Sequence, residues 1–188
     1  MPSGSYLLSD HDGPYAVETF RCAAGPAGWR YVGTRTDPGG RPLLALDLAV
    51  DDRWRAVRLV LTAGGVELRG GMVGPEAVWR CGPDQHAEHA EHTEHAAGFT
   101  GDSPAFAVAT ARLLALEVGG LARLRLVRLS AALGALTVDE GWGRTPDEQG
   151  TQRYEAADLG TGARRVVHLA GEVVVDAGGV DLQTLTRA

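Results

Sequence analysis

The chain has 188 residues, a hydrophobic content of 44% and a formal net charge of −6, which is the size and balance of one average globular domain. The mild acidity argues against general affinity for nucleic acid or anionic membranes. There is no Lys and no Asn in the chain, which excludes a P-loop lysine, a Schiff-base lysine and an N-glycosylation sequon.

The first residues and the two cysteines bear on where the protein resides. Met1-Pro2-Ser3-Gly4-Ser5-Tyr6 lacks the positive and apolar segments of a secretory leader. No apolar run approaches the roughly 20 residues that span a bilayer. Cys22 and Cys81 lie far apart without metal-ligand spacing, which favours two inert thiols in a reducing compartment over a disulfide. We expect a cytoplasmic protein with no integral membrane segment.

Alternating residue types mark strands in the first half of the chain. Residues 44–50 read Leu-Ala-Leu-Asp-Leu-Ala-Val, and residues 55–61 repeat the alternation. A period of two is typical of strands with one buried face. Gly64-Gly65 predicts a turn, and a short strand is expected over residues 66–72.

A histidine repeat follows. Residues 85–95 read Gln-His-Ala-Glu-His-Ala-Glu-His-Thr-Glu-His. Imidazole and carboxylate groups bind zinc and nickel, so four histidines are candidate metal ligands: His86, His89, His92 and His95. A period of three drifts about 60° per step around a helix, so four rings do not converge on one ion. The repeat is typical of low-complexity sequence. It favours a mobile loop at residues 83–97 over a metal site, and we expect no bound cofactor.

The next segment has helical spacing. Ser103 suits an N-cap and Pro104 the first helical position. Phe106 and Leu113 fall on one helical face, and Gly119-Gly120 ends the pattern. We predict a helix over Pro104–Val118 that packs its apolar face on a sheet.

Strand signals return at the end of the chain. Residues 173–175 and 180–182 flank Asp-Ala-Gly-Gly, which predicts a hairpin. With 26 glycines and short strands throughout, a mainly β domain is expected over residues 1–188, as an antiparallel sandwich, barrel or curved sheet.

Sequence motifs for catalysis are missing. The chain has no Gly-x-Ser-x-Gly, His-Glu-x-x-His or glycine-rich phosphate loop. Neighbouring carboxylates, as in Asp51-Asp52 and Asp139-Glu140, point to opposite faces of a strand or are solvated at turns. A non-enzymatic protein is therefore favoured over an enzyme.

Three segments in order resemble a largely uncharacterised bacterial family named for glycolipid binding. The first runs from Leu46-Asp47-Leu48 through Asp52-Arg53-Trp54-Arg55 to Val78-Trp79-Arg80. The second is Gly98–Pro104 leading to Arg112-Leu113-Leu114. The third is Gln152-Arg153-Tyr154 with the final hairpin. Together they cover about Tyr15 to the end. The chain departs from the family at Ala107-Val108-Ala109, where the family has a polar Thr-Asn-Thr.

The resemblance implies a strongly curved antiparallel sheet, a half-open barrel wrapped around one or two short helices, similar to periplasmic lipoprotein carriers. It also implies ligand-binding residues within these segments: Asp102, Phe106, Arg112, Leu113, Gln152, Arg153 and Tyr154. Arginine forks suit headgroup phosphates or sugar oxygens. The expected function is non-enzymatic binding of a lipid, glycolipid or other amphipathic small molecule in an apolar groove between the predicted helix and the sheet. Phe106 and Leu113 are expected to face into this groove, with Arg112 and Arg153 at its rim. The alternative is an enzyme or metal-dependent protein whose site is scattered. The oligomeric state stays open.

Overall fold

The computed structural model describes residues 1–25, 27–83 and 91–186. Within them the chain forms one helix and fifteen strands: β1 (Ser3–Asp10), β2 (Gly13–Gly25), β3 (Gly28–Thr36), β4 (Pro42–Val50), β5 (Ala56–Ala63), β6 (Val66–Val73), β7 (Glu76–Pro83), β8 (Glu91–His95), β9 (Gly98–Gly101), α1 (Pro104–Leu114), β10 (Leu121–Leu129), β11 (Ala135–Glu148), β12 (Thr151–Asp158), β13 (Arg164–Ala170), β14 (Val173–Ala177) and β15 (Val180–Thr186). The mainly β prediction is confirmed, since strand far exceeds helix.

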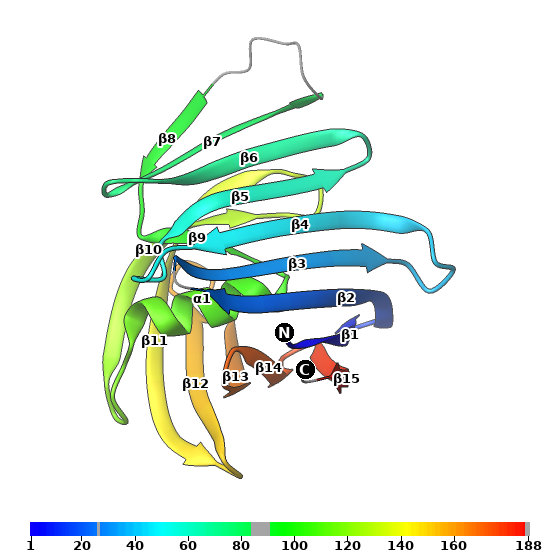
Figure 1. The fold of residues 1–188 in the computed structure, drawn as a ribbon. Helices are drawn as coiled ribbons and strands as arrows, with labels where there is room; N and C mark the ends of the chain where they lie inside the picture. Colours follow the sequence, from blue (N-terminus) through cyan, green and yellow to red (C-terminus); the bar gives the residue numbers. More distant parts are fainter. Residues whose placement is uncertain (26, 84–90, 187–188) are drawn as a thin grey trace.

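All fifteen described strands belong to one sheet, in the order β8 to β1 followed by β15 back to β9. Consecutive strands pair with each other, except β8 and β9. β1 also pairs with β15, so the two ends of the chain meet in the middle of the sheet (Figure 1). β8 and β9 are the two edges, and the sheet is not closed into a barrel.

One strand pair departs from the antiparallel pattern. β9 runs parallel to β10, with Phe99 opposite Val127, and α1 is the crossover between them. The periodicity of the sequence did not predict this βαβ unit, because β9 has only four residues. Ala96 and Ala97 connect β9 directly to β8, which is the opposite edge of the sheet.

Part of the predicted histidine loop is a strand. Glu91–His95 form β8, which pairs with β7 through Val78 opposite Thr93. The loop prediction was wrong for these residues because backbone pairing with β7 holds the segment, although all five side chains are exposed. His86 and His89 lie outside the described residues.

The helix starts where the sequence predicts and ends earlier. Ser103 is the N-cap residue and Pro104 the first helical residue. Ala115 takes a left-handed conformation with φ of 44°, and its N–H donates a hydrogen bond to the carbonyl of Ala111. The helix therefore ends at Leu114 and not at Val118. α1 contacts β9 and β14, and we call the sheet face that it covers the inner face.

Alternate residues of most strands form the core on the inner face. Tyr6, Phe20 and Tyr31 stack in a row, with ring centroids 4.7 and 5.5 Å apart, and join β1, β2 and β3. Trp142 on β11 and Tyr154 on β12 are buried on the other half of the sheet. Among the described residues, no helix has the length and apolarity to cross a membrane.

Candidate functional site

A cavity of about 640 Å³ lies at the N-terminal end of α1, and we call it the inner cavity. Its lining combines apolar and charged side chains from both halves of the sheet and from α1, among them Leu8, Arg35, Ala107, Arg128, Arg165 and Val174. Ser103 and the exposed Asp102 complete it beside the helix. This volume is in the usual range for small-molecule pockets.

One wall of the inner cavity is a buried network around Glu18. The Glu18 carboxylate accepts hydrogen bonds from Tyr31 Oη at 2.7 Å, Ser103 Oγ at 2.6 Å and Arg35 Nη2 at 2.9 Å. Glu18 and Arg35 are 1% and 3% exposed. Burial, and next the charge of Glu18, hold the pKa of Tyr31 well above its ordinary value, so the phenol stays a donor.

Gly33 makes room for this network. A Cβ at Gly33 would lie 2.8 Å from Tyr31 Cε1 and 3.2 Å from Glu18 Oε1. Glycine at this position of β3 therefore lets the two side chains meet across the neighbouring strands.

A second network lies across β10 to β13, where each strand contributes one charged residue. Arg128 donates to Asp158 at 2.7 Å and to Glu140 at 3.2 Å. Arg165 donates to Glu140 at 2.8 Å, and its guanidinium carbon lies 5.4 Å from the centre of the Trp142 ring. Trp142 Nε1 also donates to Glu140, which is fully buried.

Asp158 is held in its charged form. The backbone N–H of Thr161, then Arg128 and the backbone N–H of Gly160 lower the pKa of Asp158 to about 2 from the ordinary 3.8. The carboxylate is therefore ionised at any physiological pH, and it fixes Arg128 at the cavity wall.

The fixed arginines keep hydrogen-bonding capacity. Arg35 uses Nε and Nη2 on Glu18, and no described residue hydrogen-bonds its Nη1. Arg165 uses only Nη2 on described residues. Because an arginine has five N–H donors, both side chains retain donors that a bound molecule could use.

A separate pocket of about 530 Å³ lies at the C-terminal end of α1, and we call it the distal pocket. Four of the residues implied by the family resemblance line it together: Arg112, Leu113, Gln152 and Tyr154. Arg112 Nη2 donates to the carbonyl of Gly171, which ties the helix to the turn between β13 and β14.

The other implied residues lie elsewhere. Asp102 lines the inner cavity. Phe106 is buried and lines a space of only about 20 Å³ between α1 and the sheet, also bounded by Leu48, Phe99 and Leu126. Arg153 donates hydrogen bonds to Thr145 and Glu155. Because successive side chains of a strand point to opposite faces, Arg153 lies on the face opposite Tyr154, its neighbour in β12.

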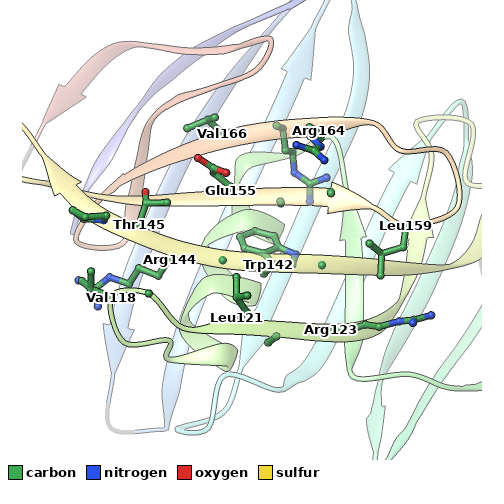
Figure 2. A pocket seen from close by; sticks show the side chains of 18 residues that line it. Val118, Leu121, Arg123, Trp142, Arg144, Thr145, Glu155, Leu159, Arg164 and Val166 are labelled. Carbon is green, nitrogen blue, oxygen red and sulfur yellow. The ribbon is translucent and has the colours of Figure 1, made fainter.

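A larger hollow, of about 1020 Å³, lies on the other face of the sheet. Figure 2 shows Leu121, Glu155 and Val166 on three strands, with α1 behind the sheet. Its floor includes Gly141 and Gly143. Leu121 is 84% exposed and Leu159 is 46% exposed, so this hollow is open to solvent. We consider it a less suitable binding site than the inner cavity.

The two described histidines of the repeat, His92 and His95, belong to no group with metal-ligand spacing among the described residues. His92 and His95 are three residues apart in β8, which puts them on opposite faces of the strand. His92 stacks on Trp79, with ring centroids 5.5 Å apart. Among the described residues, one exposed group has metal-ligand spacing, Asp10, His11 and Asp12.

Sequence reasoning missed, as site residues, the charged members of the two networks beside the inner cavity, which are Glu18, Arg35, Arg128, Glu140, Asp158 and Arg165. A signal for two of them was present. Glu18 is in phase with Ala16 and Phe20, and Arg35 is in phase with Trp29 and Tyr31, all of them buried. A charge at an inward position of each of two neighbouring strands predicts a buried ion pair.

No protein-family model matches the chain, and no curated protein matches it. Among solved structures, the crystal structure of a DUF1089 family protein from Pseudomonas aeruginosa is similar, with a TM-score of 0.59 and 19% sequence identity. The likeness covers 98% of this chain and 94% of that chain. It concerns the fold alone.

Proposed function

We propose that this protein is a non-enzymatic binding protein for a lipid, glycolipid or other amphipathic small molecule, held in the inner cavity. In this proposal the curved sheet is a half-open barrel around α1. The observation that carries it is the mixed lining of the cavity, in which ion-paired arginines face apolar residues such as Leu8 and Val174. Ligand sites commonly combine apolar walls with a few fixed polar groups.

The apolar part of the ligand would lie against Leu8, Val174 and Val180. Each buried methylene contributes about 0.8 kcal/mol before ordering costs. The space between α1 and the sheet at Phe106 is too small for this role, at about 20 Å³.

The polar part of the ligand would be a neutral, hydroxyl-rich headgroup. Asp10, Asp102 and Asp158 line the cavity together with its arginines. Two of these arginines also donate to buried carboxylates outside the lining, Arg35 to Glu18 and Arg165 to Glu140. The charges of the two signs nearly cancel, which disfavours a phosphate dianion. Hydroxyl groups both donate and accept, so they suit a wall that presents arginine donors beside carboxylate acceptors.

An enzymatic function has one point in its favour, the contact of Ser103 Oγ with Glu18. Glu18, however, already accepts from Tyr31 and Arg35 as well. A carboxylate engaged by three donors, one of them a guanidinium, is a poor general base. Binding is therefore favoured over nucleophilic catalysis.

The test is displacement of an environment-sensitive fluorescent fatty acid by decanoate and by an alkyl glucoside of the same chain length. We expect both to compete, with the glucoside binding more tightly. Ala107→Phe, which places a ring in the cavity from α1 and changes no charged residue, should weaken binding at least tenfold. Ala45→Phe, at an exposed position of β4, is the matched control and should bind as the wild type does.

Two results would contradict the proposal. One is a wild-type protein that binds neither the probe nor the two amphiphiles at millimolar concentration. The other is an Ala107→Phe variant that is folded, by circular dichroism and thermal unfolding, and binds with unchanged affinity.

A further inference from the structure

The distal pocket has polar features that the proposed function does not use. It shares no lining residue with the inner cavity. Trp54, Arg112, Glu117, Arg144, Gln152 and Tyr154 are among the residues around it. It therefore can be tested by itself.

Two buried polar atoms of this pocket's lining have no partner among the described residues, Gln152 Oε1 and Arg144 Nε. Buried polar groups are nearly always hydrogen-bonded, so each exception needs an explanation. The rest of the Arg144 guanidinium is fixed, since Nη1 donates to the carbonyl of Leu116 and Nη2 to Asp147, both at 3.1 Å. One acceptor and one donor thus remain unpaired beside one pocket.

The lining also includes an aromatic residue in an unusual conformation. Trp54 has φ of 62°, which bulky residues rarely adopt. Asp51 holds the turn, because its side chain accepts from the backbone N–H groups of Arg53 and Arg55, and its carbonyl accepts from that of Trp54. Such outliers cluster at ligand sites. The Trp54 ring also contacts Trp29, with centroids 5.5 Å apart, which limits its movement.

We infer that the distal pocket is a binding site for a neutral polyhydroxyl compound of monosaccharide size. Hydroxyl groups both donate and accept, so a polyhydroxyl compound can satisfy the Gln152 Oε1 acceptor and the Arg144 Nε donor alike, which neither a carboxylate nor an ammonium group can do. The apolar face of a sugar ring suits the Trp54 side chain. Asp52 and Glu117 offset Arg53 and Arg112 around the pocket, and Asp147 pairs with Arg144. This balance favours an uncharged ligand.

Binding requires a small rearrangement. Neither Gln152 Oε1 nor Arg144 Nε exposes surface, so both side chains shift towards the pocket when the sugar enters, the Gln152 amide by turning. The terminal torsion of glutamine is broad and permits this turn.

The experiment uses the full chain with methyl glucoside, methyl galactoside and myo-inositol as probes. Saturation-transfer NMR and calorimetry measure binding, and the side-chain amide signal of Gln152 reports its rearrangement. We expect saturable binding of at least one probe, with a shift of that signal. Gln152→Met keeps the side-chain length and removes the acceptor, so it should weaken binding at least tenfold. Gln183→Met, on the exposed face of β15, is the matched control.

Thermal unfolding separates this role from a structural one. Without sugar, Gln152→Met should be as stable as the wild type or more stable, because an unpaired buried oxygen is gone. Ala107→Phe should leave sugar binding unchanged, which separates this inference from the proposed function. The inference is overturned if no probe binds saturably, if Gln152→Met binds as tightly as the wild type, if Gln152→Met unfolds many degrees earlier, or if Ala107→Phe abolishes sugar binding.

Discussion

Ser103 Oγ lies 2.6 Å from Glu18 Oε1 and joins the first turn of α1 to β2, across 85 residues of sequence. The hydroxyl does not cap its own helix. It is instead one of three donors to a buried carboxylate, so the position of the helix depends on a charge in the sheet.

Ser103→Ala should destabilise the protein by about 1–3 kcal/mol, because it removes one donor from a buried charged acceptor. The free energy of unfolding in urea measures this loss. Ser3→Ala, for which no side-chain hydrogen bond is present among the described contacts, should change stability by less than about 0.5 kcal/mol. Equal effects of the two substitutions would contradict the interpretation.

The Glu18–Arg35 pair should show strong coupling. Arg35→Met leaves a carboxylate buried without its cation, which costs about 3–5 kcal/mol. Adding Glu18→Gln should recover part of that loss, since the uncompensated charge is removed. A double-mutant cycle by chemical denaturation measures the coupling. Additive losses would show that the two residues do not act as a pair.

Asp158 should make stability depend on pH in acid. Its pKa in the folded protein is about 2, below the ordinary 3.8, so its stabilising effect is complete above about pH 4 and is lost as pH falls towards 2. The urea midpoint should therefore drop over this range, and it should drop less in Asp158→Asn. Asp52→Asn, at an exposed turn, serves as the control. If the urea midpoint of Asp158→Asn fell with pH as steeply as that of the wild type, Asp158 would not be the source of the pH dependence.

His92 should contribute to the stability of the β8 edge through Trp79. Their rings are stacked with an interplanar angle of 18°, and such contacts are worth about 0.5–1 kcal/mol. We expect His92→Ala to lose that amount in denaturant unfolding and His95→Ala, on the other face of β8, to lose almost none. A larger loss from His95→Ala would reverse the assignment of faces.

Much of the fold could be predicted from local pattern. Residues 44–50 and the final hairpin have a clear period of two, and Ser103-Pro104 gives the start of α1 correctly. Local pattern failed where contacts with another strand decide the secondary structure. β8 has no apolar alternation, and its pairing with β7 is what makes it a strand.

The candidate site could be predicted only in part. The residues around Arg112 and Gln152 were suggested by the resemblance, and the structure brings them to one pocket. The pairing of Glu140 with Arg128 could not be predicted, because the two residues are on different strands and one sequence does not specify which strands pair. The cytoplasmic location stays a prediction.

The exposed β8 edge has a consequence for the behaviour of the protein at high concentration. A free strand edge offers unpaired backbone groups to any other strand, which is a route to aggregation. β8 carries Glu91 and Glu94 among five exposed side chains, so a second copy approaching edge to edge meets like charge. Glu91 and Glu94 thus disfavour edge-to-edge pairing of two copies, an effect that depends on charge and not on the identity of any one residue.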